Sequence, residues 1–511
     1  MLDHSGKLLE GVFSMSSFYP RTSGSETRQK KMPFYINRNF AFTWIGSSVS
    51  SLGDTVLDTT LVLWMVTRLA RGQPWAPLAV SGIFLAASIP VLALGPIAGV
   101  FADWWVEKKR LMMRMDLARA VLTVLLLVGT LITSLADLDQ GWFWLFLQLG
   151  MLYGVVGLVS VCSQFFSPAS SVLFYDIVEE AHRARASGLF QFVFSIAAIG
   201  GPPLATLLFF ASGVQWALLL DAFSFLISFC CLLLVRVPLQ TSDTGPSEEK
   251  KSFFHRFREG VRFYVTNSVL MMILITGILI FAWTSAFQVL GVFFVSQNLH
   301  ASISWYGFIG MAAGGGFAGG AVFASVFASR VGVTHLFWSS MLVMGMLVIC
   351  YSRMTHFFPA LCIVFLIGCC AAAINVTVSP IAMHVTPRAL IARVVSVLTP
   401  VMTLASMLYS LLIGWLISSV LRNFHVTILG MSFGPIDMIY FLTGCLALLG
   451  GFYAMVKVRG VRLAKEGEER KPMEEVQRTW LRDNNTRRMR RKNLLLFTSL
   501  LWRADPSESE E

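Results

Sequence analysis

The sequence contains little charge for its length. Only 14% of its 511 residues are Asp, Glu, Lys or Arg, whereas 55% are hydrophobic and the mean hydropathy is +0.67. A soluble protein of this size needs far more charge on its surface, which argues against a soluble enzyme, a disordered chain or a secreted disulfide scaffold. About half of the chain must therefore lie in lipid, or in protein that lipid surrounds.

Motifs of several function classes are missing as well. Residues 1–33 have no apolar core followed by a small-residue cleavage site, so we expect a retained cytoplasmic tail. We find no ATPase motif, no nucleophile–base pair and no metal-ligand spacing, and we expect neither an enzyme nor a bound cofactor or metal. All eight cysteines lie in apolar runs, where we interpret them as small buried hydrophobic residues.

Long stretches without charged residues predict twelve transmembrane helices. The predicted spans are residues 40–68, 77–103, 111–135, 142–167, 186–210, 215–235, 269–296, 303–329, 332–352, 356–384, 394–421 and 434–456. A cytoplasmic linker (237–267) separates a first bundle (39–236) from a second (268–457), and the ends are a cytoplasmic tail (1–38) and a basic tail (458–511). Two halves of nearly equal length indicate an all-α membrane protein, with twelve transmembrane helices in two six-helix bundles around a central cavity.

The placement of Lys and Arg predicts the orientation of the chain. With these spans, 36 of the 40 basic residues fall on one side of the membrane, if Arg119 is counted at the edge of its loop. The other side holds only Arg68, Arg71, Arg353 and Arg422. Because cytoplasmic loops carry the excess of basic residues, we expect both termini to be cytoplasmic. We expect the protein to lie in the plasma membrane.

The joint after the second span carries a recognisable motif. It reads GPIAGVFADWWVEKKR, residues 95–110. Gly99, Asp103, Lys109 and Arg110 resemble the loop signature of the major facilitator superfamily, with Trp104 where that family commonly has arginine. The resemblance implies a cytoplasmic latch that holds the two bundles together in one conformation. The alternative is an ordinary basic loop on the cytoplasmic side.

Further stretches resemble the drug and macrolide exporter-like branch of this superfamily. They are SSVSSLGDTVLDTTLVLW in the first span, FFSPASSVLFYDIVEE after the fourth, LLLDAFSFLISF in the sixth and FREGVRFYVTNSVL before the seventh. The resemblance covers roughly residues 38 to 457 and is strongest before residue 280. It implies a transporter whose two bundles rock about a site near the bilayer midplane.

Three carboxylates within predicted spans are candidates for proton coupling. Asp54 and Asp58 are four residues apart, so they lie on one face of the first helix, and Asp221 is the only charged residue between positions 186 and 235. Ionisable groups inside a membrane are costly and point to function, and neighbouring carboxylates repel, which favours proton uptake by one of them. The alternative for each is a structural carboxylate that neighbouring helices satisfy.

Glycine and proline punctuate the fifth and eighth spans. Gly201 and Pro202 match the Gly-Pro core of an exporter signature in the fifth span, where proline bends a helix and glycine permits close packing. In the eighth span, GMAAGGGFAGG places glycines four residues apart, which is typical of helix packing.

Polar and aromatic residues in otherwise apolar spans are candidates for the substrate cavity, although each is also compatible with simple packing. They are Trp64, Gln148, Tyr153, Gln191, Trp283, Gln288 and Asn375. The C-terminal RRMRRKNLLLF, residues 487–497, suggests a segment on anionic lipid headgroups, the alternative being a disordered basic tail. The linker residues Phe253, Phe254, Phe257 and Val261 suggest a second interfacial helix, and neither segment needs a nucleic-acid partner.

These observations favour a secondary active transporter that works by alternating access. The expected activity is proton-coupled efflux of an amphiphilic or hydrophobic small molecule, such as a drug, a macrolide or a siderophore-like compound. Two alternatives remain from the sequence: an importer or lipid-moving relative of the same fold, or a membrane scaffold that does not transport.

Overall fold

The computed structural model describes residues 36–105, 107–135, 141–236, 261–386, 391–422, 424, 426–428 and 431–458. Twelve of its helices are long and apolar enough to cross a membrane, as the sequence predicts. The first six are α2 (Arg38–Trp64), α3 (Ala76–Trp104), α4 (Lys108–Leu135), α5 (Trp142–Ile177), α6 (Glu180–Ser212) and α7 (Val214–Leu234). The second six are α9 (Ser268–Gln297), α10 (Tyr306–Val331), α11 (Val333–Ser352), α12 (Phe357–Val385), α13 (Ile391–Trp415) and α14 (Pro435–Val458).

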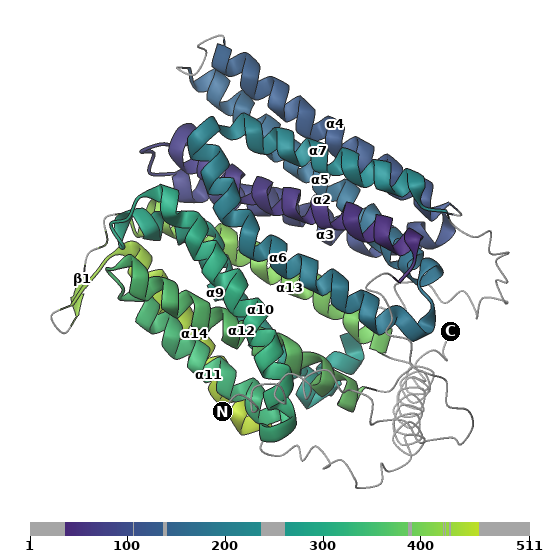
Figure 1. Cartoon of the computed structure of the whole chain (residues 1–511). Helices are drawn as coiled ribbons and strands as arrows, with labels where there is room; N and C mark the ends of the chain where they lie inside the picture. Colours follow the sequence, from purple (N-terminus) through teal and green to yellow (C-terminus); the bar gives the residue numbers. More distant parts are fainter. Residues whose placement is uncertain are drawn as a thin grey trace, which may run out of the picture.

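The two sets of six helices form two bundles that lie side by side (Figure 1). Within the first bundle, α2 packs on α6 and α7, α3 packs on α5, and α4 packs on α5 and α7. The second bundle repeats these five pairings: α9 packs on α13 and α14, α10 on α12, and α11 on α12 and α14. Each helix of one bundle thus has an equivalent in the other, which is the arrangement of an internal structural repeat.

The first helix of each bundle begins in the same way. The Asn37 side chain caps α2 by accepting the Phe40 amide at 2.6 Å, and the Asn267 side chain caps α9 by accepting the amides of Val269 and Leu270. Asparagine at this position satisfies amides that the first helical turn leaves without a partner. The repeat therefore extends to the residues that start each bundle.

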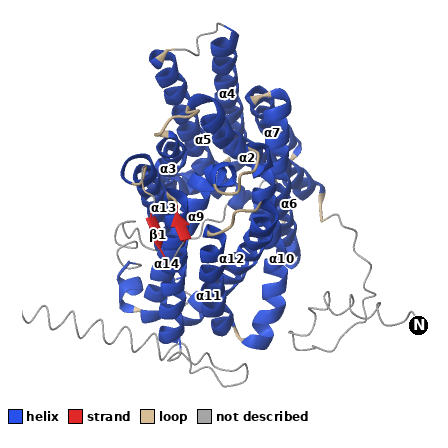
Figure 2. Ribbon diagram, turned by 90° about the vertical axis from the view of Figure 1, so that its left-hand side faces the viewer, coloured by secondary structure: helices blue, strands red, loops and turns tan. Residues whose placement is uncertain are grey.

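Short irregular elements lie at the bundle end opposite residues 36 and 458, which we call the far end. One turn of π-helix, Met65–Leu69, follows α2, and another, Leu416–Val420, follows α13. A turn of 3₁₀-helix, Ile303–Trp305, precedes α10. A two-stranded hairpin, β1 (Val426–Ile428) with β2 (Met431–Phe433), connects α13 to α14 (Figure 2), and the sequence interpretation did not include it.

The two bundles approach each other closely in the far half of the molecule. Gly310 of α10 lies against Pro202 of α6, where a side-chain carbon on the glycine would come within 2.7 Å of the proline ring. The equivalent pair is α3 with α13, and the Leu78 amide donates at 3.2 Å to the hydroxyl of Ser418 in the π-turn that follows α13. The repeat relates these two helix pairs, because α6 is equivalent to α13 and α10 to α3. We call the two contacts together the far seal.

Large apolar side chains cover the periphery of both bundles. Phe143, Leu207 and Phe358, for example, are each 65 to 71% exposed. Such a surface is expected where lipid replaces water as the solvent. Cys230, Cys350 and Cys362 are also exposed, so the expectation that all eight cysteines are buried is wrong for these three.

The predicted joint between the fourth and fifth spans is far shorter than expected. Helix α5 continues past Pro168 to Ile177, and α6 begins at Glu180, so only two residues separate the two helices. Proline removes one backbone donor and bends a helix but does not always end it, particularly where the helix packs against neighbours.

Candidate functional site

A buried ion pair lies inside the first bundle, on α4. Arg119 and Asp116, three residues apart, form a salt bridge, and their exposed fractions are 4% and 0%. The Arg119 guanidinium lies between the rings of Phe166 on α5 and Phe225 on α7, at 4.4 and 4.6 Å from their centroids. Paired charge and two cation–π contacts are the arrangements that make a buried arginine tolerable. The orientation tally, which placed Arg119 at a loop edge, is therefore wrong for this residue.

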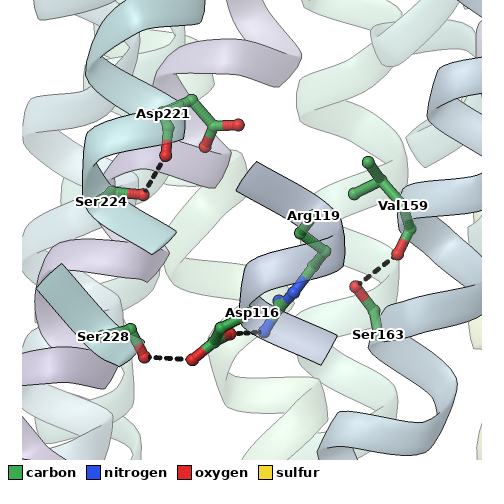
Figure 3. A network of polar contacts seen from close by, with 7 residues as sticks. All are labelled: Asp116, Arg119, Val159, Ser163, Asp221, Ser224 and Ser228. Carbon is green, nitrogen blue, oxygen red and sulfur yellow. Dashed lines mark hydrogen bonds and ion pairs between the residues drawn. The ribbon is translucent and has the colours of Figure 1, made fainter. Parts of the chain in front are cut away.

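Two polar contacts join α4 to α7, one at the ion pair itself and one at Asp221; Figure 3 shows the first of them. The Ser228 hydroxyl donates to Asp116 Oδ2 at 2.7 Å, and the Thr123 hydroxyl donates to Asp221 Oδ2 at 3.2 Å. Positions 116 and 123 are seven residues apart, as are 221 and 228, so the antiparallel helices meet at both levels in one register. We call these two levels the Asp116 layer and the Asp221 layer.

Helix α2 covers both layers with glycine. A side-chain carbon at Gly46 would lie 3.2 Å from the Ser228 Cα, and one at Gly53 would lie 2.7 Å from the Ser224 Cβ. Gly46 and Gly53 are also seven residues apart, so α2 follows the register of α7. Because these glycines have no side chains, the α2 backbone can approach the two layers closely. This approach brings Asp54, the residue after Gly53, near Asp221.

Asp54 and Asp58 on α2 are the more solvent-accessible carboxylates of this charged region. Asp54 interacts electrostatically with Arg119 and Asp116, and Asp221 interacts with both Asp54 and Asp58. Asp58 is exposed, and Asp54, one helical turn earlier, is partly exposed. The three predicted carboxylates therefore come together, and Asp116 and Arg119 join them.

Asp221 has one carboxylate oxygen that lacks a hydrogen-bond partner. Its side chain is 0% exposed, and while Oδ2 accepts from Thr123, Oδ1 is buried without a hydrogen-bond partner. That oxygen lies 3.0 Å from the position that a side-chain carbon on Gly53 would occupy. Chemically, the described group offers four carboxylates and one guanidinium that share a small space, which is suited to taking up and releasing protons.

The predicted latch residues have other contacts. Lys109 donates to the Leu233 and Val235 carbonyls at 3.0 and 2.7 Å, so it caps the end of α7 within its own bundle. Arg110 pairs with Glu107 at 2.5 Å on an exposed turn. Gly99 and Asp103 lie on α3, and their side-chain surroundings are outside the described residues. The latch remains a prediction.

The predicted helix-bend residues lie where helices meet. Pro202 is inside α6 at the far seal, and a side-chain carbon at Gly201 would come within 2.6 Å of Thr55 on α2. The glycines of α10 divide between two neighbours: Gly314 faces Ala198 of α6, while Gly320 faces Cys369 of α12. The packing interpretation of the α10 glycines agrees with these contacts.

The seven substrate-cavity candidates do not share one site. Tyr153 donates to the Ala79 carbonyl at 2.8 Å, and Trp283 packs in an aromatic cluster with Tyr351 and Tyr440, so both hold helices together. Trp64 and Gln148 line a cavity at the far end, whereas Asn375 lines a second cavity within the other bundle. Gln191 is exposed on α6, and Gln288 is partly exposed on α9.

The cavity around Asn375, which we call the apolar pocket, has a volume of about 450 Å³. Helices α9, α10, α11, α12 and α13 line it, mostly with apolar side chains such as Ile280, Phe317 and Met402. Thr276, Asn375 and Ser379 are its polar members. A mostly apolar pocket with a few polar groups is the usual environment of a small-molecule ligand.

Sequence reasoning missed Asp116 and Arg119 as a site. The available signal was an acid and a base three residues apart on a predicted helix, a spacing that places them side by side. Of the interfacial segments, only Val261 lies in a described helical turn, 261–266. Outside the described residues lie Phe253, Phe254, Phe257, residues 459–511 of the basic tail and most of the N-terminal tail.

Comparisons with known proteins agree with this architecture. The family model of the Major Facilitator Superfamily matches residues 43–410 and 272–504. An uncharacterized MFS-type transporter of Bacillus subtilis, YkuC, is 25% identical over 425 residues, which are 82% of this chain and 94% of the relative. Macrolide efflux protein A of Streptococcus pyogenes is 23% identical over 249 residues, 49% of this chain and 55% of that protein.

Solved structures resemble the chain in fold. The nucleoside transporter NupG superposes with a TM-score of 0.62 at 13% identity, over 82% of this chain and 99% of that structure. A bacterial homologue of the iron transporter ferroportin, in its inward-facing state, gives a TM-score of 0.63 at 13% identity, over 82% and 98% of the two chains. With twelve membrane-spanning helices in two repeated bundles and a family model that matches most of its length, the chain is a multi-pass membrane protein that belongs to the Major Facilitator Superfamily.

Proposed function

We propose that this protein exports an amphiphilic or hydrophobic small molecule in exchange for protons, by alternating access. The single observation that carries the proposal is the convergence of Asp54, Asp58, Asp221 and the Asp116–Arg119 pair inside one bundle. Burying charge in a membrane costs free energy, so such a group is retained where its protonation does work. The macrolide efflux relatives, which match about half of this chain, support export.

Alternating access would require the far seal to open. In the described conformation, α6 meets α10 and α3 meets α13 in the far half, which would block passage to that end. We propose that both termini are cytoplasmic in a plasma membrane, as the distribution of basic residues indicates, and that the far end faces outward. The described structure would then be the state closed to the outside.

Protons would supply the driving force through the carboxylates of α2 and α7. An inward proton gains about 2.3 kcal/mol for each 100 mV of membrane potential, which is enough to concentrate a substrate. The apolar pocket of the second bundle supports an amphiphilic substrate, because its few polar groups lie among apolar walls. Charge and substrate would thus be handled in different bundles.

Inside-out vesicles from a host without its own drug pumps test this proposal. The wild-type protein should accumulate an amphiphilic dye or a macrolide in these vesicles and release it when an uncoupler collapses the proton gradient. Asp54→Asn should insert normally but show no gradient-driven accumulation. Asp176→Asn, near the end of α5, is the matched control and should transport normally. Full gradient-driven transport by Asp54→Asn would remove this carboxylate from the mechanism, and accumulation in intact cells instead would indicate import.

A further inference from the structure

The cavity at the far end, which we call the far cavity, is strongly polar and basic. It has a volume of about 1100 Å³ and lies between the two bundles, beyond the far seal. Three arginines line it: Arg68 from the π-turn after α2, Arg71 from the next turn, and Arg422 from the turn after α13. The described lining residues include no Asp or Glu. The cavity therefore carries positive charge from both bundles.

The basic residues of this end are unusually concentrated. Of the four arginines that the sequence places at the far end, only Arg353 is not among the lining residues, and it pairs with Asp437 at 3.8 Å. Residues 136–140, which include Asp137 and Asp139, lie outside the described residues. Even if both of those carboxylates bordered the cavity, three arginines would leave its charge positive.

One π-turn lines this cavity, and a second ends close in sequence to a lining arginine. Residues 65–69 follow α2 and carry Arg68, and residues 416–420 follow α13 and end two residues before Arg422. Turns of π-helix are rare and occur frequently at functional sites, because the extra residue redirects the side chains that follow. Arg68, within the first turn, and Arg422, just after the second, reach one space from the two bundles.

The remaining walls suit a molecule with an apolar body. Trp64, Phe209 and Phe293 provide aromatic surface, while Gln215 and Gln297 provide neutral hydrogen-bond donors. Arginine binds carboxylate and phosphate oxygens through several N–H groups at once, and amide donors satisfy the oxygens that remain. The combination is complementary to an amphiphile with a negative head.

We propose that the far cavity binds the anionic group, a carboxylate or a phosphate, of an amphiphilic molecule through Arg68, Arg71 and Arg422. The inference rests on the proposed function insofar as the bound molecule is the transported one. The inference narrows the substrate class to anionic amphiphiles, because the three arginines of the far cavity would repel a cationic amphiphile of the same size. A lipid headgroup and a soluble amphiphile share the relevant chemistry.

Two dyes with the same ring system but opposite charge test the proposal. The full-length protein in phosphatidylcholine nanodiscs is titrated with anionic carboxyfluorescein and with cationic rhodamine 6G, and binding is followed by fluorescence anisotropy. The wild type should bind the anionic dye more tightly. The triple variant R68Q/R71Q/R422Q should weaken that binding roughly tenfold or more and leave the cationic dye unchanged or slightly tighter. Raising NaCl from about 0.05 M to about 0.5 M should weaken wild-type binding of the anionic dye.

Arg330→Gln is the matched control, because it removes an exposed arginine from the end of α10 that lies away from the far end. It should bind both dyes as the wild type does. Adding phosphatidylglycerol to the nanodiscs distinguishes the two sources of the anion: competition with the dye assigns the cavity to a lipid phosphate, and lack of competition assigns it to a soluble amphiphile. Equal affinity of the triple variant and the wild type for carboxyfluorescein would overturn the proposal, as would equal losses for both dyes.

Asp54→Asn separates this inference from the proposed function. This variant leaves the three arginines unchanged, so it should bind carboxyfluorescein with wild-type affinity. If arginine-dependent binding is found and no proton-driven transport of any substrate occurs in the wild type, the anion site stands and the transport proposal fails. If transport is proton-driven and the arginine variant neither binds nor transports anions differently from the wild type, the anion site fails alone.

Discussion

The two bundles share their helix pairings but differ in what their helices enclose. The first bundle buries an ion pair, Asp116 with Arg119, and a carboxyl group, Asp221, near the middle of its helices. In the second bundle, the charged residues of the described helices lie near helix ends, and the interior holds the aromatic cluster of Trp283, Tyr351 and Tyr440. A repeated backbone architecture thus supports two different chemistries.

The comparison suggests a division of labour. Helix packing is set by small residues and shape, so it survives changes in the side chains that face the interior. Buried charge requires matched partners at each position. The first bundle supplies them from α4 and α7 in a seven-residue register, which the glycines of α2 follow. If this difference is real, the first bundle should require its buried charges, whereas the second bundle should tolerate exchange of one aromatic residue for another.

The largest expected effect comes from joining the bundles. Replacing Leu78 and Ser418 with cysteine and oxidising them, or adding a short bifunctional thiol reagent, should abolish transport, because the far seal could no longer open. A reducing agent should restore activity after oxidation. Each single cysteine variant, treated alike, is the control, since the chain already has eight cysteines. Transport that continues in the cross-linked protein would contradict separate motion of the bundles.

Removing the buried arginine should have the next largest effect. Arg119→Met leaves Asp116 as an uncompensated buried charge, which costs about 3–5 kcal/mol in comparable buried pairs. The thermal midpoint of the detergent-solubilised protein should fall markedly, as measured by fluorescence-detected size exclusion. Replacing both residues, Asp116→Leu with Arg119→Met, should recover much of the loss. A single variant as stable as the wild type would show that the pair is not buried as described.

An aromatic exchange in the second bundle should cost less. Trp283→Phe keeps a ring beside Phe287, Tyr351 and Tyr440, so it should cost less than the roughly 3–5 kcal/mol that deleting a whole buried aromatic side chain costs. Its thermal midpoint should therefore lie closer to that of the wild type than the midpoint of Arg119→Met does. The reverse order of the two variants would contradict the proposed difference between the bundles.

The smallest pair of effects concerns two buried hydroxyl groups. The Tyr351 hydroxyl is buried without a hydrogen-bond partner, so Tyr351→Phe should be neutral or slightly stabilising. Thr123→Val removes the donor to Asp221 Oδ2 and should destabilise by about 1 kcal/mol or more, because it leaves a buried acceptor unpaired. Both changes can be measured as shifts of the thermal midpoint. If Thr123→Val raises the thermal midpoint, the stabilising hydrogen bond described for the Asp221 layer is contradicted.

Much of the fold follows from the sequence, because charge is excluded from lipid and gaps between charged residues mark each span. The length of α5 does not, since Pro168 and the polar residues after it are typical of a joint, although packing continues the helix to Ile177. The hairpin between α13 and α14 also lacks a clear local signal.

The site was predictable in part. Asp54, Asp58 and Asp221 stand out as single charges in apolar runs. Asp116 and Arg119 do not, because they follow a cluster of basic loop residues and resemble its continuation. Only the three-dimensional structure shows that Phe166 and Phe225 enclose the guanidinium, since these rings come from helices remote in sequence.

Proton release on substrate binding is the most direct test of the central claim, that the carboxylates of the first bundle exchange protons for substrate. The purified protein, in weakly buffered detergent solution with a pH-sensitive dye, is mixed with a transported amphiphile. The account predicts that the wild type releases protons in proportion to bound substrate, and that Asp54→Asn with Asp58→Asn binds substrate but releases fewer or none. Undiminished proton release by this double variant would contradict the account.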